Sequence, residues 1–459
     1  MEKEFENKKT IPVLPQKFCD NMKMILGEQF EDYLASFTSP SNTALRINPF
    51  KRWTGFDYKD FHLRKIDWTE NGYYYQNDNA GKTIYHDSGL YYIQDASAMA
   101  VVELMDIKPH EKVLDLCASP GGKSTQISEK LKNTGLLVSN EIVPSRAKTL
   151  SFNIERMGIT NAIVLNESVE KISDKFPKYF DKVLVDAPCS GEGMFRKNHE
   201  AINEWEKTDI YSCAKRQLDI LEKASICVKS GGTLAYSTCT FNIEENEHVI
   251  AKFLTHHPDF YIANNDKSHF FSSGIDIRQY YKDIDIDTTK CVRLFPHIQE
   301  CEGHFICIMK RKEIGEIEYK NEKTNINNKT RDVVKKWFKD NNMSVDIDNI
   351  SIINDNIYQN PEFTINVKTL KFLRYGLHLG QIIKDRFEPS HSLALAIKNP
   401  QNVINIDKSQ LEKYLHGDVL NCENNNNGWY IISYENIPIG WGKNVNGTIK
   451  NYYPKGLRK

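Results

Sequence analysis

Two cysteines stand where a thiol can do chemistry. Cys189 lies in the segment Asp-Ala-Pro-Cys-Ser-Gly after the apolar run 183–185, and Cys239 lies in Tyr-Ser-Thr-Cys-Thr after the run 233–235. A thiolate is a strong nucleophile, and covalent catalysis divides one difficult step into two easier ones. A lone cysteine is more often a small buried apolar residue. Two thiols at two strand ends instead indicate chemistry on a pyrimidine, in which one thiol adds to the ring and the other helps to release it.

Methylation of cytosine is the reaction that such a pair suits. Carbon 5 of cytosine is a poor nucleophile, but a thiolate that adds at carbon 6 turns the ring into an enamine, which can attack an electrophilic methyl group. The attacking thiol needs a depressed pKa, and a base must finally remove the proton from carbon 5. Asp186 opens the first cysteine segment and is placed to hydrogen-bond a base edge, where protonation would let it donate.

A glycine-containing loop precedes both cysteines. Residues 114–123 read Leu-Asp-Leu-Cys-Ala-Ser-Pro-Gly-Gly-Lys, and Cys117 stands where a phosphate loop needs glycine, which disfavours NTP hydrolysis. The glycines still allow a sharp turn into a helix and a close approach of a ligand to the backbone. Glu141 ends the next apolar run, where an acid accepts hydrogen bonds from ribose hydroxyls in doubly wound folds. These features predict a nucleoside-bearing cofactor. Amine methylation is disfavoured because the Asn/Asp-Pro-Pro-aromatic motif is missing.

The elements that must position these residues follow a βαβ rhythm. Helix-length segments separate the apolar runs, which predicts an α/β fold with a mostly parallel sheet covered on both faces. Those runs are 113–116, 136–138, 162–165, 183–185 and 234–236. The runs 291–295 and 304–309 lie too close together for a crossover helix, so we expect a hairpin and an antiparallel last strand.

The chain is long enough for several units. The first is a small α+β unit that either has its own core or contacts RNA, and an RRM-like fold is one option for it. A polar linker separates the central α/β unit from two C-terminal units. The expected divisions are 1–95, 96–311, 312–330 (the linker), 331–395 and 396–459.

Composition limits the class of protein. Hydrophobic residues make up 40% and charged residues 26% of the chain, and the formal net charge is -1, which is typical of a globular protein. No apolar run approaches the length of a membrane span, and the N-terminus has no apolar signal core. The ten cysteines include no CxxC pair and no metal-ligand spacing, so we expect reduced thiols in the cytoplasm and no metal site. We also expect a monomer.

Basic residues occur in two places that suit RNA. Arg196 and Lys197 follow the Cys189 segment, and no acidic residue follows Glu435. Basic groups contact phosphates and aromatic rings stack on bases, so a C-terminal RNA surface is expected, although solvated surface charge is the alternative. The residues concerned are Lys443, Lys450, Lys455, Trp441, Tyr452 and Tyr453.

These segments resemble a known family, the RNA cytosine-5 methyltransferases related to Sun and RsmF. The similarity includes the segments 114–123, 140–141, 186–197 and 236–247. It continues beyond the central unit into the segments 376–380, 385–391 and 440–458, which resemble the C-terminal part of bacterial RsmF-type enzymes.

The resemblance implies a class I, Rossmann-like methyltransferase fold and a PUA-like last unit. It also implies S-adenosylmethionine as methyl donor and a cytosine of small-subunit (16S) ribosomal RNA, free or in the 30S subunit, as acceptor. By match, Cys239 is the nucleophile, Cys189 assists product release, and Asp186 touches base and cofactor. The cofactor residues implied are Cys117, Ala118, Ser119, Pro120, Gly121, Gly122, Lys123, Glu141, Arg146, Glu167 and Asp186.

Two departures and two rival functions stand beside this resemblance. Ser119 replaces the alanine common in the family, and Glu167 stands where the family often has aspartate. A DNA cytosine methyltransferase would use the Pro-Cys thiol, but its Glu-Asn-Val motif is not evident. A non-catalytic ribosome-assembly factor is a second alternative, because a fold can outlive its activity. Retention of both cysteines and Asp186 argues against it.

Overall fold

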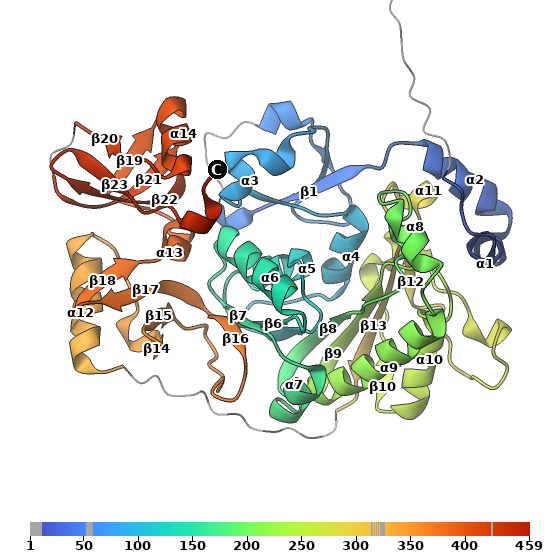
Figure 1. The fold of residues 1–459 in the computed structure, drawn as a ribbon. Coiled ribbons are helices and arrows are strands. Elements are labelled where there is room, and N and C mark those ends of the chain that lie inside the picture. Colours follow the sequence, from blue (N-terminus) through green and yellow to red (C-terminus); the bar gives the residue numbers. More distant parts are fainter. Residues whose placement is uncertain are drawn as a thin grey trace, which may run out of the picture.

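The computed structural model describes residues 12–51, 58–313, 326–423 and 426–459, together with residues 315, 317, 319 and 321. Part of the predicted linker 312–330 therefore lies outside the described residues, as do residues 1–11 of the predicted first unit. The central α/β unit lies between the N-terminal helices α1 and α2 and the C-terminal sheets (Figure 1).

A mixed sheet forms the centre of the molecule, in the order β11-β12-β13-β9-β8-β5-β6-β7-β16, with β10 beside β13. Its middle strands β9, β8, β5, β6 and β7 are parallel, which confirms the predicted α/β fold. These strands are β5 (Lys112–Asp115), β6 (Leu136–Asn140), β7 (Ala162–Leu165), β8 (Phe180–Asp186) and β9 (Val228–Thr238).

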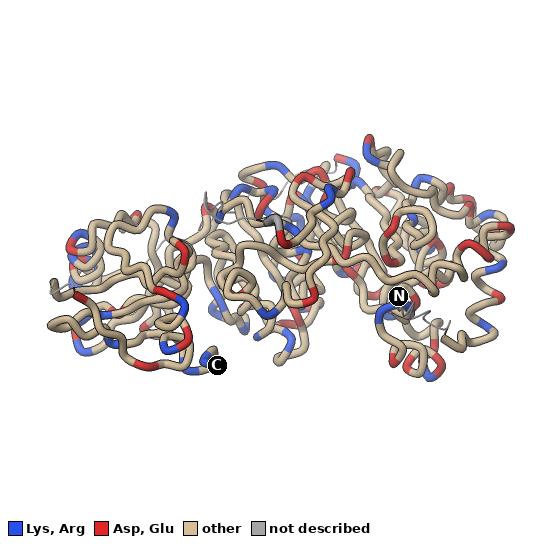
Figure 2. The backbone as a smooth tube through the Cα atoms, turned by 90° about the horizontal axis from the view of Figure 1, so that it is seen from above, with Lys and Arg blue, Asp and Glu red and all other residues tan. Residues whose placement is uncertain are grey.

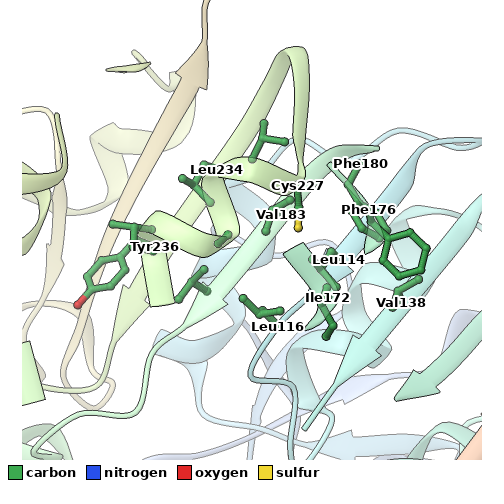
Figure 3. Packing of buried hydrophobic residues seen from close by; sticks show 14 of the residues in the cluster. Leu114, Leu116, Val138, Ile172, Phe176, Phe180, Val183, Cys227, Leu234 and Tyr236 are labelled. Atoms are coloured by element: carbon green, nitrogen blue, oxygen red, sulfur yellow. The ribbon is translucent and has the colours of Figure 1, made fainter. Parts of the chain in front are cut away.

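Side chains of the parallel strands alternate between two hydrophobic clusters, because successive residues of a strand face opposite sides. Leu114 and Val183 pack against α7, α9 and α10, whereas Val113 and Leu184 pack against α4, α5 and α6. Figure 3 shows the first cluster, with Phe176 and Phe180 closing one end. The helices are α4 (Ala96–Leu104), α5 (Gly122–Lys130), α6 (Pro144–Arg156), α7 (Val169–Lys175), α8 (Glu200–Trp205), α9 (Ile210–Cys227) and α10 (Glu247–His256).

Antiparallel strands extend the sheet on both sides. β12 (Val292–Leu294) and β13 (His304–Arg311) pair antiparallel, and β13 pairs antiparallel with β9, as predicted. A short helix, α11 (Pro296–Gln299), lies in the connection, and β10 (Phe260–Ile262) and β11 (Ser272–Ser273) complete this side. On the other side β16 (Phe372–Tyr375) pairs antiparallel with β7. The sheet therefore takes a strand from the segment 331–395, which the local pattern did not indicate.

The N-terminal residues divide between two places. Helices α1 (Gln16–Leu26) and α2 (Phe30–Ala35) pack against aromatic residues of the central unit, including Phe195 and Phe241. The strands form a sheet in the order β2-β3-β1-β4, and several of their side chains join the cluster around α4 and α5. The expected separate core is thus limited to a small cluster around Leu45. The elements are β1 (Thr43–Ile47), β2 (Arg64–Lys65), β3 (Gly72–Tyr75), α3 (Ile84–Asp87) and β4 (Tyr91–Ile93).

The C-terminal residues form two further sheets, β14-β15-β17-β18 and β19-β21-β22-β23-β20. Trp337, Trp429 and Trp441 lie in one hydrophobic cluster that joins these sheets. The elements are α12 (Asn328–Asp340), β14 (Ile350–Ile353), β15 (Asn356–Gln359), β17 (Leu377–Ile383), β18 (Arg386–Pro389), α13 (His391–Ala396), β19 (Val403–Ile406), α14 (Lys408–His416), β20 (Leu420–Asn421), β21 (Gly428–Tyr434), β22 (Ile437–Val445) and β23 (Thr448–Asn451).

The described residues contain neither a helix that could cross a membrane nor a cluster of side chains that could hold a metal ion. None of their helices has both the length and the apolar character that crossing a membrane requires. None of their His, Cys, Asp and Glu side chains gather in threes or more around a point that could hold a metal ion.

Candidate active site

The two predicted cysteines lie together at the carboxyl ends of neighbouring strands. Cys189 follows β8 and Cys239 follows β9, and the parallel register of these strands sets Asp186 opposite Ser237. The two Sγ atoms are 3.4 Å apart, and both residues are free thiols with partly exposed side chains. The distance allows both sulfurs to act on one ring.

The contact between the sulfurs makes the two thiols different. A hydrogen bond from Cys189 lowers the pKa of Cys239, whereas the same bond, together with burial, raises the pKa of Cys189 well above its usual value. Cys239 is therefore the thiol that ionises first, and Cys189 keeps its proton. A nucleophile must be a thiolate, so the geometry favours Cys239 for attack.

Asp186 is held as a carboxylate beside the thiols. Lys123 donates to its Oδ2 atom at 2.8 Å, and Ser237 donates to its Oδ1 atom at 2.7 Å. Burial, the largest single influence, would raise the pKa of Asp186, but the charges of Lys123 and His304 and the hydrogen bonds from Lys123 and Ser237 together bring that pKa below its usual range. This environment favours an ionised Asp186 that accepts hydrogen bonds over a protonated Asp186 that donates to the base.

Two buried carboxylates that the sequence analysis missed join the cysteine loops. Glu245 accepts hydrogen bonds from the Ser190 backbone at 3.0 Å, from Gln217 at 2.6 Å and from Asn242 at 2.7 Å. Glu192 accepts from the backbone of Phe241 at 2.8 Å and of Asn242 at 2.9 Å. Each links the loop after β8 to the loop after β9. Both follow a cysteine motif by a few residues, which was their only signal in the sequence.

The glycine loop turns from β5 into α5. Gly121 has a left-handed φ of 112°, and a Cβ atom there would lie 3.1 Å from the Leu150 side chain. Glycine is thus required by the predicted turn into the helix and also by packing, and the close approach of a ligand stays a prediction. Lys123, in the first turn of α5, reaches Asp186. Burial raises the pKa of Cys117 above its usual range, so this third thiol is not a nucleophile.

An arginine from the N-terminal sheet holds the start of α5. Arg46 is 1% exposed and donates to the Gly122 carbonyl at 3.2 Å, to Thr125 Oγ1 at 2.6 Å and to Glu129 Oε1 at 2.8 Å. All three acceptors belong to α5. The N-terminal unit therefore fixes the helix that begins at the glycine loop, a contact that nothing in the local sequence indicated.

The residues predicted to bind the cofactor lie along the same edge of the sheet. Glu141 follows β6, accepts a hydrogen bond from the Val143 backbone at 2.9 Å, and lies 3.5 Å from the half-exposed guanidinium of Arg146. Glu167, beyond β7, accepts from Lys171 at 2.7 Å and from the Lys371 backbone at 2.6 Å. Glu167 thus also fixes the segment that leads into β16.

This edge fits S-adenosylmethionine. A carboxylate at Glu141 suits ribose hydroxyls, and the ionised Asp186 suits a positively charged sulfonium group. Ile142 and Val143, beside Glu141, are 61% and 41% exposed and offer apolar surface to a purine ring. Asp115 has a buried Oδ1 atom with no partner among the described residues, next to the loop.

The two basic residues expected to contact RNA near the active site, Arg196 and Lys197, both pair with acidic side chains. Arg196 is nearly enclosed: its side chain is 9% exposed, donates to the Ser36 carbonyl and pairs with Glu302 at 3.3 Å. Lys197 pairs with Asp95 at 2.5 Å. The structure thus gives Arg196 a structural partner, and this argues against a phosphate contact.

In the C-terminal unit the lysines and the aromatic residues differ. Lys450 and Lys455 are exposed, and Lys443 lies over the Trp429 ring at 5.3 Å. Trp441 is 2% and Tyr453 6% exposed, so the expectation that these rings stack on bases is wrong. Figure 2 shows blue and red residues interspersed along the C-terminal part of the chain in that view, rather than one wholly basic face.

Family comparisons agree with this site. The model of the 16S rRNA methyltransferase RsmB/F matches residues 102–310. Three models specific to RsmF match the flanking regions: its N-terminal domain at residues 14–96, its first C-terminal domain at 336–397, and its PUA domain at 401–459.

Several solved structures share the fold. A methyltransferase homolog from Pyrococcus horikoshii is 26% identical, with a TM-score of 0.55, over 65% of this chain and 96% of that one. NSun6 from the same organism, solved with SFG, is 18% identical with a TM-score of 0.56, over 66% of this chain and all of that one, and it supports the fold alone.

Full-length relatives are similar throughout. The ribosomal RNA small subunit methyltransferase F of Vibrio vulnificus is 30% identical over 473 residues, with 97% of each chain covered. The protein of the same description from Vibrio cholerae is 31% identical over 474 residues, again with 97% of each chain covered. With both cysteines adjacent at the strand ends, this chain belongs to the RsmF family of S-adenosylmethionine-dependent 16S rRNA cytosine-C5 methyltransferases.

Proposed function

We propose that this chain methylates carbon 5 of a cytosine in small-subunit ribosomal RNA, with Cys239 as nucleophile and Cys189 as the residue that assists release. The observation that carries the assignment is the 3.4 Å contact of the two sulfurs, together with the lowered pKa of Cys239 and the raised pKa of Cys189. A thiol stabilised as thiolate attacks, and its protonated neighbour does not.

The attack forms a bond between Cys239 Sγ and carbon 6 of the ring, and the displaced electron pair makes carbon 5 nucleophilic. S-adenosylmethionine, when bound, supplies the methyl group as an electrophile. The residues that would hold it are the 117–123 loop, Glu141, Arg146, Glu167 and Asp186. Lys123 and Ser237 keep Asp186 fixed and ionised at the site.

Release requires the proton on carbon 5 to leave. Its electron pair then restores the C5=C6 double bond, and the bond between carbon 6 and Cys239 breaks to return a thiolate. We assign the assistance of this step to Cys189: once Cys239 is bonded to carbon 6 it no longer holds the Cys189 proton, so Cys189 can pass that proton to solvent and accept the proton from carbon 5. Glu192 and Glu245 keep the two loops in register while the ring is attached.

The RNA must also present its cytosine. The base has to leave its stack, at a cost of a few kcal/mol, and contacts away from the base can supply that energy. Lys443, Lys450 and Lys455 are proposed for phosphate contacts because they are three of the four lysines of the acid-free C-terminal segment; the fourth, Lys459, pairs with Asp87. We also propose that the protein acts in the cytoplasm, where its free thiols would stay reduced, and that it acts as a monomer.

The test is methyl transfer from labelled S-adenosylmethionine to small-subunit RNA, assembled small subunits or DNA. The proposal expects labelled 5-methylcytosine in RNA or subunits and none in DNA. Label in DNA would favour the DNA methyltransferase alternative. No label in any substrate, from protein that binds S-adenosylmethionine, would favour the assembly-factor alternative. Mapping 5-methylcytosine in ribosomal RNA with and without the protein would then identify the target.

A further inference from the structure

A buried histidine lies beside the carboxylate of the reaction site. His304 is the first residue of β13, whose partner strand β9 ends directly before Cys239. Its side chain is 6% exposed, and its Nε2 atom has no hydrogen-bond partner among the described residues. The Oδ1 atom of Asp186 lies 3.9 Å from this nitrogen, which is too far for a hydrogen bond.

The contacts of the other ring nitrogen, Nδ1, show which nitrogen of His304 carries the proton. His304 Nδ1 lies 3.1 Å from the Gly303 carbonyl and 3.3 Å from Ser97 Oγ. The carbonyl can only accept, and the Ser97 hydroxyl already donates to Asp95 at 2.6 Å, so both partners require a proton on Nδ1. Burial and the charge of Lys123 lower the pKa of His304 to about 4, so the ring is neutral near pH 7. Its Nε2 atom is therefore a bare acceptor.

Two acceptors consequently face each other across a short gap. Asp186 Oδ1 and His304 Nε2 cannot bond to one another, and a buried acceptor without a donor is unfavourable. The Asp186 side chain is 30% exposed, so a ligand that reaches the carboxylate also reaches the edge of the gap. An amino group that donates one hydrogen bond of about 2.9 Å to each acceptor holds the two acceptor atoms roughly 5 Å apart. Asp186 Oδ1 and His304 Nε2 must therefore move about 1 Å farther apart to receive it.

We propose that Asp186 and His304 together receive the exocyclic amino group of the target cytosine and thereby reject uracil. The inference rests on the proposed function and adds the residue that selects the base. The thiol chemistry does not select it, because carbon 6 of uracil also accepts a thiolate. Uracil carries an oxygen where cytosine carries the amino group, so it would place a third acceptor against Asp186 and His304 and leave His304 Nε2 without a donor. Sites built on such hydrogen bonds discriminate strongly against an analogue that lacks them.

Adduct formation on fluorinated RNA tests the proposal. Fluorine at carbon 5 replaces the proton that must leave during release, so the covalent adduct persists. The target is first mapped on small-subunit RNA that contains 5-fluorocytidine. Rates of adduct formation are then compared between two transcripts, one with 5-fluorocytidine and one with 5-fluorouridine at the mapped position. His304→Phe is expected to reduce the cytosine-to-uracil rate ratio about 10- to 100-fold, mainly through slower reaction of cytosine. His304→Gln, which retains an acceptor oxygen, is expected to recover most of the ratio.

Controls separate this outcome from other failures. His297 also lacks hydrogen-bond partners among the described residues and packs against Tyr33 and Phe295, so His297→Phe should leave the ratio unchanged. S-adenosylmethionine affinity, measured by calorimetry, should be unchanged in all variants. An unaltered ratio in His304→Phe that binds S-adenosylmethionine would overturn the inference, and so would a loss in His304→Gln as large as in His304→Phe. Absence of any adduct in the parent protein would instead count against the proposed function.

Discussion

The cysteine loops and the glycine loop meet at one edge of the sheet but are held in different ways. Glu192 and Glu245 join the loops after β8 and β9 from within the central unit. The start of α5 is held instead by Arg46, which comes from the N-terminal sheet. The two cysteine loops are therefore joined to each other by carboxylates of the central unit, with α1 and α2 packed on their aromatic side chains, whereas the start of α5 is anchored by a buried side chain from a second unit.

Removal of the nucleophile should have the largest effect. Cys239→Ala removes the sulfur that forms the bond to carbon 6, so methyl transfer should fall by about 10⁴-fold or more. S-adenosylmethionine affinity should stay unchanged, because the glycine loop is held independently. Transfer of labelled methyl groups to RNA measures the first quantity and calorimetry the second. Cys227→Ala is the control and should keep its activity, since this thiol lies in the core away from the site and burial raises its pKa.

Removal of the Arg46 side chain should affect the glycine loop and α5 rather than the cysteine loops. Arg46→Met leaves the buried Glu129 without its partner and should cost about 3–5 kcal/mol in the free energy of unfolding, measured by denaturant titration. It should also weaken S-adenosylmethionine binding, because α5 loses its anchor. Arg46→Met combined with Glu129→Met should recover stability without recovering cofactor affinity. Unchanged affinity in a folded Arg46→Met protein would contradict the proposed coupling of the two units.

A change at Glu245 should leave the cofactor loop alone. Glu245→Gln places an amide nitrogen among donors from Ser190, Gln217 and Asn242, so the cysteine loops should shift. Adduct formation on 5-fluorocytidine RNA should slow about 10- to 100-fold, as small displacements of reacting groups do. Glu244→Gln is the control, since Glu244 bonds His248 and Tyr281 rather than the cysteine loops. Equal rates of adduct formation in Glu245→Gln and Glu244→Gln would contradict the role of Glu245 in holding the two cysteine loops together.

The smallest effect is expected farthest from either loop. Lys443, Lys450 and Lys455 changed together to Gln should reduce the salt dependence of RNA binding, because fewer phosphate contacts release fewer counterions. Cofactor affinity and adduct formation at saturating RNA should not change. A triple variant with the salt dependence of the parent would favour solvated surface charge for these lysines.

Much of the central unit could be predicted because its signals are local. The apolar runs that form β5, β6, β7, β8 and β9 each reveal a strand, and parallel strands necessarily bring Cys189 and Cys239 to one edge. The glycine turn was likewise predicted, whereas the packing of Gly121 against Leu150 was not.

Other features depend on contacts that no local pattern reveals. Arg46 lies in β1, a strand inside the N-terminal sheet, yet its acceptors are some 80 positions away in the chain. β16 joins the sheet from a segment that looked separate. His304 carried no motif, and Trp441 was expected on the surface although its indole donates to the Ser390 carbonyl inside the C-terminal core. Such roles are decided by tertiary packing rather than by residue type or spacing.

The central claim is the division of labour between the two cysteines, and covalent trapping on RNA tests it most directly. Parent protein, Cys189→Ala and Cys239→Ala are each incubated with unmodified small-subunit RNA and S-adenosylmethionine, and the protein–RNA adduct is measured on denaturing gels. The account predicts that Cys189→Ala accumulates the adduct because attack survives while release fails, and that Cys239→Ala forms none. An adduct in Cys239→Ala, or normal turnover in Cys189→Ala, would contradict it.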